Sequence, residues 1–157
     1  MNSEAIKKIF NSLKLRDGVA QKLISLFPDD KLNWKPSNEV RTVQEIVAHI
    51  YGGARASVKA IQTGTLTKEE SDKFESSSAS TNTELLKLCK ESFDSIYEVA
   101  MNSTDEVLRK TTNIFYGDFT VGDVLEFFPV EHSHHYGQLT VYARILGITP
   151  PFAYDFE

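Results

Sequence analysis

Apolar residues recur at three- and four-residue steps in four separate stretches of the chain, and this spacing places them on one face of an α-helix. The stretches run from residue 3 to 27, from 43 to about 63, from 82 or 83 to about 101, and from 121 to about 146. None of them shows the sustained alternation that indicates a strand. We therefore predict an all-α fold, an antiparallel four-helix bundle.

Two connections between these helices are long. Residues 65–81 are polar and are predicted to form a surface connection, whereas residues 102–119 are irregular and include a segment at 113–118 that suits a brief extended structure. With two long connections, the helices need not follow a simple up-down-up-down order.

Capping signals define the ends of two helices. Thr42 and Glu45 have the spacing of a capping box, and so do Thr120 and Asp123, so helices are expected to begin just after each threonine. The second stretch ends near Gly64, which suits a C-terminal cap. Small residues at 52–57, two of them glycines, predict that a neighbouring helix or a ligand comes close.

Length and charge limit the classes of function. The chain of 157 residues fits one domain, 1–157, and its net charge of −5 with scattered basic residues argues against nucleic acid as a partner. A single cysteine, Cys89, excludes an internal disulfide and suits a reducing compartment. No apolar stretch approaches the roughly 18 residues that cross a bilayer. We expect a cytoplasmic protein without a membrane partner.

The histidines are unevenly distributed. Of the four, His49 lies in the second helical stretch, and His132, His134 and His135 lie together in the fourth. On a helix, Glu131 and His132 flank His135 at i−4 and i−3, whereas His134 points away. Side chains at such spacings on a helix can reach one ion.

These polar residues interrupt apolar stripes on two helices. An unpartnered polar group in a core costs several kcal/mol, roughly 2–7, so the two interruptions are expected to satisfy each other or to share an ion. Imidazole and carboxylate ligands suit zinc, nickel, iron or manganese. The alternative is that the inward histidines are hydrogen-bonded core residues and that Glu131 is a solvated helix residue.

Several short motifs resemble the DinB-like superfamily, also called YfiT-like. They are Trp34-Lys35-Pro36, residues 42–49, residues 135–139, and the pattern that runs from Tyr142 to Pro151. The resemblance implies a four-helix bundle, often a homodimer, with zinc or nickel held by three histidines. His49 and His135 match two of these ligands. The third falls on Glu131, so either Glu131 is the ligand or His132 replaces it from one residue along.

The resemblance also implies a function. It suggests a divalent-metal-dependent enzyme that acts on a small molecule in stress or detoxification, either a thiol S-transferase using a low-molecular-weight thiol or a hydrolase. Gln138, three residues beyond His135, is expected either to orient an imidazole of the site or to be a surface glutamine at the edge of the dimer or bundle. The alternative is a non-catalytic, stress-associated metal-binding or interaction protein. The sequence leaves open whether the site is catalytic.

Overall fold

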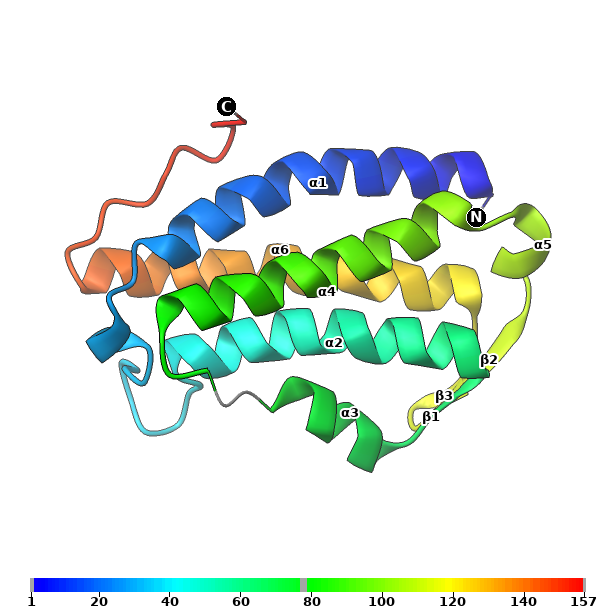
Figure 1. The fold of residues 1–157 in the computed structure, drawn as a ribbon, viewed down its shortest axis with the longest axis horizontal. Helices are drawn as coiled ribbons and strands as arrows, with labels where there is room; N and C mark the ends of the chain where they lie inside the picture. The colour runs from blue at the N-terminus through cyan, green and yellow to red at the C-terminus, as the bar shows by residue number, and fades with distance from the viewer. Residues whose placement is uncertain (1, 77–78, 157) are drawn as a thin grey trace.

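Four long helices form a bundle in the computed structural model, which describes residues 2–76 and 79–156 (Figure 1). Each of the four predicted helices is present. Their bounds are α1 (Ser3–Ser25), α2 (Val43–Thr63), α4 (Asn82–Asn102) and α6 (Val121–Ile145).

The helices do not follow an up-down-up-down order. Both α1 and α2 pack against α4 and α6, so α1 and α2 occupy opposite corners of the bundle. In Figure 1, α1 and α6 run in one direction and α2 and α4 in the other. The prediction of an antiparallel bundle is therefore correct for α1 with α4 and for α2 with α6, whereas the other two neighbouring pairs are parallel.

The connection between α2 and α4 explains this order. Residues 65–81, predicted as a surface connection, instead contain strand β1 (Thr65–Leu66) and helix α3 (Lys68–Glu75). Because α3 packs along α2 and returns the chain to the end where α2 began, α4 can run parallel to α2 (Figure 1). The serine-rich part of the predicted connection includes residues 77 and 78, which lie outside the described residues.

A small sheet corrects the all-α prediction. Its strands are β1, β2 (Thr111–Ile114) and β3 (Gly117–Thr120), in the order β1-β2-β3. Strand β1 is parallel to β2, with Thr65 opposite Asn113, and β2 is antiparallel to β3. The brief extended segment predicted at 113–118 is thus part of a hairpin. The short helices η1 (Asp29–Lys31) and α5 (Asp105–Leu108) complete the elements.

Local signals in the sequence account for the helix ends. Both predicted capping boxes are present, at Thr42 with Glu45 and at Thr120 with Asp123. Gly64 ends α2 with a φ of 79°, a left-handed conformation that favours glycine. Helix α6 continues through Pro129, which removes only one backbone donor.

The core is apolar and includes the lone thiol. Cys89 is fully buried, and this burial raises the pKa of its thiol well above the ordinary value, so it is a packed core residue. Trp34 anchors the connector after α1, with its ring edge-on to Tyr142 at a centroid distance of 5.6 Å. Within residues 2–76 and 79–156, no helix is both long enough and apolar enough to cross a membrane.

Candidate metal centre

Three of the predicted ligands meet where α2 faces α6. His49 comes from α2, and Glu131 and His135 lie one turn apart on α6. The Oε2 atom of Glu131 lies 3.4 Å from Nε2 of His49 and 3.2 Å from Nε2 of His135. One potential ligand atom from each of the three residues lies within 4.8 Å of the other two.

Each imidazole of this centre is held by a second polar side chain. Nδ1 of His49 lies 2.6 Å from Oε2 of Glu75, and Nδ1 of His135 lies 2.7 Å from Oε1 of Gln138. A carboxylate and an amide oxygen only accept hydrogen bonds, so Nδ1 is the donor in both rings. In a neutral ring with Nδ1 as the donor, Nε2 carries the lone pair that a metal ion binds, and both Nε2 atoms lie beside the carboxylate of Glu131.

The donor set fits a divalent transition metal. Ligand atoms about 2.0–2.1 Å from a tetrahedral zinc ion lie roughly 3.3 Å apart. The two measured separations from Glu131, 3.4 Å to His49 and 3.2 Å to His135, are close to that value. Two histidines and one glutamate are also a ligand set of catalytic zinc sites, which keep a further position open.

Burial and charge set the protonation of two groups. Burial lowers the pKa of His135 below its ordinary value, which favours the neutral ring that binds a metal ion. Burial acts to raise the pKa of Glu75, but the hydrogen bond from His49 and the positive charge that His49 can carry act against it. The net result is a lowered pKa, so Glu75 is ionised near neutral pH.

His132 lies elsewhere in the bundle. Its side chain is buried, with Nε2 3.2 Å from Oδ1 of Asp17 on α1, and the same carboxylate accepts hydrogen bonds from Tyr51 and Gln21. The structure thus groups Glu131, and not His132, with the other two predicted ligands. His134 is exposed, as predicted.

Glu75 is the residue of this centre that the sequence reasoning missed. It lies at the end of α3, inside the region predicted as a surface connection. The sequence does contain one signal for the start of α3: Thr67 and Glu70 have the spacing of a capping box, and they form one in the structure. The approach of α3 to His49 is a non-local contact, which no spacing along the chain indicates.

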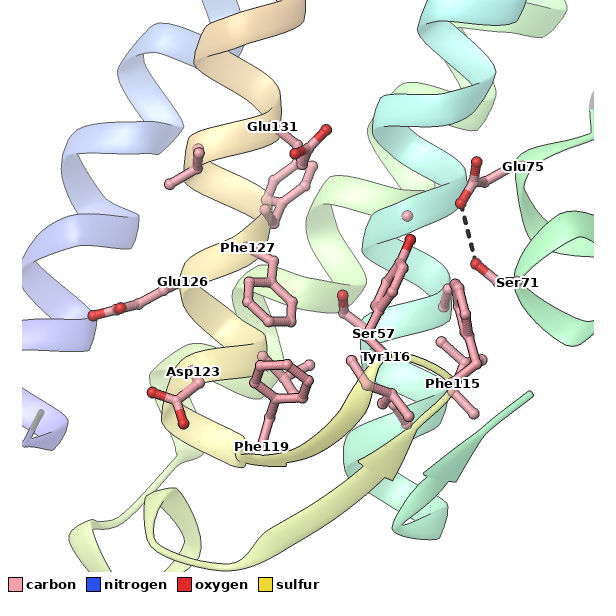
Figure 2. A pocket seen from close by; sticks show the side chains of 18 of the residues that line it. Ser57, Ser71, Glu75, Phe115, Tyr116, Phe119, Asp123, Glu126, Phe127 and Glu131 are labelled. Atoms are coloured by element: carbon pink, nitrogen blue, oxygen red, sulfur yellow. Dashed lines mark hydrogen bonds between the residues drawn. The ribbon is translucent and has the colours of Figure 1, made fainter. Parts of the chain in front are cut away.

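The centre lies at the wall of a large cavity. His49 and Glu131 both line this cavity, whose volume is about 770 Å³ (Figure 2). His49 also lines a smaller polar cavity of about 370 Å³, together with Lys35, Arg41 and Glu75. Small molecules thus have space next to the candidate ligands on two sides.

Several solved structures have the same fold as this chain. A DinB-like protein from Bacillus subtilis (YjoA) is 22% identical, with a TM-score of 0.74 and coverage of 93% of this chain and 96% of that one. YfiT from Bacillus subtilis, described as a probable metal-dependent hydrolase with an unusual four-helix bundle topology, is 16% identical, with a TM-score of 0.76 and coverage of 95% and 91%. A mycothiol-dependent maleylpyruvate isomerase is 13% identical, with a TM-score of 0.65 and coverage of 98% and 66%.

These likenesses show the fold of this chain. A search of curated proteins gave no match at the significance required. The sequence model of the DinB family matches residues 1–157, so the chain belongs to the DinB family.

Proposed function

We propose that the protein is a divalent-metal-dependent enzyme that transfers a low-molecular-weight thiol to a small electrophile, or hydrolyses a small molecule, at the centre formed by His49, Glu131 and His135. One observation carries the proposal: three potential ligand atoms lie within 4.8 Å of one another, and two of their residues line a cavity of about 770 Å³. A purely structural ion has no need of such a cavity.

The residues of the chain have separable roles in this proposal. His49, Glu131 and His135 would hold zinc or nickel. Glu75 and Gln138 keep the two imidazoles in the orientation that presents Nε2. When bound, the ion would supply Lewis-acid chemistry that lowers the pKa of a thiol or water beside it, so that a nucleophile exists near neutral pH.

Exposure of the centre supports catalysis over a structural role. The side chain of His135 is buried, but that of Glu131 is 49% exposed, so the centre is open on the side of the cavity. Three protein ligands would leave a bound ion with an open position for a substrate atom. The names of two structural relatives, a probable metal-dependent hydrolase and a mycothiol-dependent isomerase, agree with chemistry of this class.

The test begins with metal content. Purified protein is stripped of metal and titrated with Zn²⁺ and Ni²⁺ by calorimetry, and one ion per chain is expected. Conjugation of cysteine or glutathione to 1-chloro-2,4-dinitrobenzene and hydrolysis of p-nitrophenyl acetate are then compared for loaded, stripped and His49→Ala protein. Activity confined to the loaded protein supports the enzyme. One tightly bound ion without an effect on either reaction would favour the non-catalytic metal-binding protein instead.

The homodimer and the cytoplasmic location stay predictions. Sedimentation of the purified protein over a range of concentrations measures its oligomeric state, and fractionation of cells that produce it measures its location.

A further inference from the structure

We propose that the cavity beside the metal centre binds an uncharged aromatic compound, and that this compound is the electrophilic or hydrolysable substrate. The inference rests on the proposed function for the role of the compound, but the binding preference follows from the cavity alone. Three features of the cavity carry it: its aromatic wall, its floor of small residues and its charge.

The wall is aromatic. Phe115, Tyr116 and Phe119 come from the β2–β3 hairpin, and Phe127 and Phe128 come from α6. In Figure 2 the rings of Phe119 and Phe127 lie on one side of the cavity and those of Phe115 and Tyr116 on the other. Phe119 and Phe127 already meet edge to face at 5.2 Å, the geometry that aromatic rings prefer.

The floor is made of small residues of α2. Gly53, Ala56, Ser57 and Ala60 lie along the helix face that the cavity reaches. A Cβ atom added at Gly53 would meet no heavy atom within 4 Å, so this part of the floor is open space. A volume of about 770 Å³ lies within the roughly 300–1,000 Å³ of cavities that enclose small organic ligands.

The charges select against anions. The described residues that line the cavity include Glu75, Asp123, Glu126 and Glu131 but neither lysine nor arginine. Lys68 lies outside the lining, 5.9 Å from the centroid of the Phe115 ring, and is paired with Asp72. An anion in this cavity would lie near negatively charged carboxylates and would find no lysine or arginine in the lining to pair with. Its binding would therefore be weakened.

Besides these acidic residues, the cavity offers uncharged hydroxyl groups. Ser57 contributes a hydroxyl, and Figure 2 shows the Tyr116 hydroxyl pointing toward the end of the cavity that holds Glu75 and Glu131. Tyr116 is 73% exposed, so its hydroxyl is free to meet an incoming molecule. A ligand that buries a ring between the phenylalanines would thus place its polar end toward the metal centre.

The test uses two fluorescent probes that share one ring system. N-phenyl-1-naphthylamine is uncharged, and 8-anilinonaphthalene-1-sulfonate differs from it by one sulfonate. Both are titrated into metal-free and metal-loaded protein. We expect the uncharged probe to bind at least tenfold more tightly than the sulfonate to the metal-free protein, and a smaller difference in the metal-loaded protein, where the cation offsets the carboxylates.

Two glycine variants locate the binding. Gly53→Leu fills the floor and is expected to weaken binding of the uncharged probe at least tenfold, whereas Gly18→Leu, at an exposed position of α1 with equally open space, is expected to leave it unchanged. If Gly53→Leu fails to fold, Ser57→Leu, one turn further along α2, carries the same expectation. Calorimetry with Zn²⁺ on the same variants shows whether the metal centre is retained.

The outcomes separate the two proposals. Selective binding of the uncharged probe that is lost in Gly53→Leu supports the cavity proposal even if the protein binds no metal, in which case the proposed function alone fails. Equal or tighter binding of the sulfonate to the metal-free protein, or binding that Gly53→Leu does not weaken, overturns the cavity proposal even if the metal centre is active.

Discussion

The carboxylate of Glu75 lies 2.6 Å from Nδ1 of His49, so a residue of α3 orients an imidazole that α2 presents to α6. Groups that hold a metal-binding histidine in this way typically change metal affinity by about 10–100-fold when removed. We therefore predict that Glu75→Ala weakens Zn²⁺ binding by about that factor while the fold is retained. Calorimetric titration measures the change.

A matched control is available on the same helix. Glu69 is exposed on α3 and pairs with Lys73, away from the imidazoles. Glu69→Ala is expected to bind Zn²⁺ as the unaltered protein does. Equal affinities for all three proteins would show that Glu75 does not orient His49.

Replacing Glu131 is predicted to affect Zn²⁺ binding, whereas replacing His132 is predicted to affect the free energy of unfolding. Glu131→Ala removes a ligand and is expected to abolish tight Zn²⁺ binding with little effect on unfolding, since its side chain is half exposed. His132→Ala removes a buried partner of Asp17 and is expected to lower the free energy of unfolding by about 2 kcal/mol, while Zn²⁺ still binds. Urea denaturation and calorimetry measure the two quantities. The reverse pattern would make His132 the ligand.

The choice between Glu131 and His132 as the third ligand could not be made from the sequence. Helical spacing places both Glu131 and His132 beside His135, because i−4 and i−3 lie on the same side of a helix. What separates them is Asp17, which draws His132 toward α1 from 115 residues away in sequence. Spacing along one helix carries no information about such a partner.

The same reasoning explains which elements were predictable. Helix α2 could be predicted at both ends, because Thr42, Glu45 and Gly64 are local signals that act within one turn. Strand β1 could not, because two residues show no periodicity and pair only with β2, almost fifty residues later. The order of the helices depends on α3, which lies in a polar region where only one capping box marked it.

Lowering the pH is predicted to remove the stabilisation that the ionised carboxylate of Glu70 gives to α3. The hydrogen bond from Lys59 of α2, followed by that from the Thr67 backbone, lowers the pKa of Glu70 from 4.5 to about 2. A carboxyl group with a lowered pKa in the folded state stabilises it at pH values above the unfolded pKa, and this stabilisation is lost as pH falls toward the folded pKa. The contribution should therefore be complete above about pH 5 and disappear between pH 4.5 and 2.

Glu70→Gln tests this expectation. The urea midpoint of the variant should lie below that of the unaltered protein at pH 6, and the gap should close as the pH approaches 2. Intrinsic fluorescence of Trp34 follows unfolding in both proteins. A gap that stays constant over this range would mean that ionisation of Glu70 does not contribute.

Gly52 is predicted to be the residue that lets α3 reach the metal centre. A Cβ atom at this position would lie 2.3 Å from the backbone oxygen of Phe74 and 2.7 Å from Cα of Glu75. Because backbone atoms cannot give way without moving the helix, Gly52→Ala should displace the end of α3 and take the Glu75 carboxylate away from His49. We expect a loss of about 1–3 kcal/mol in the free energy of unfolding and about tenfold weaker Zn²⁺ binding.

Gly53→Ala is the matched control, because it makes the same chemical change one residue along the same helix. Its Cβ would meet nothing within 4 Å. Alanine is favoured over glycine inside a helix by roughly 0.5–1 kcal/mol, so Gly53→Ala should be slightly more stable than the unaltered protein and bind Zn²⁺ equally well. Opposite signs of the stability change at two adjacent glycines would trace the effect to contact with α3. If both variants gained stability, the close approach of α3 to α2 would not be required, and Glu75 would reach His49 by another arrangement.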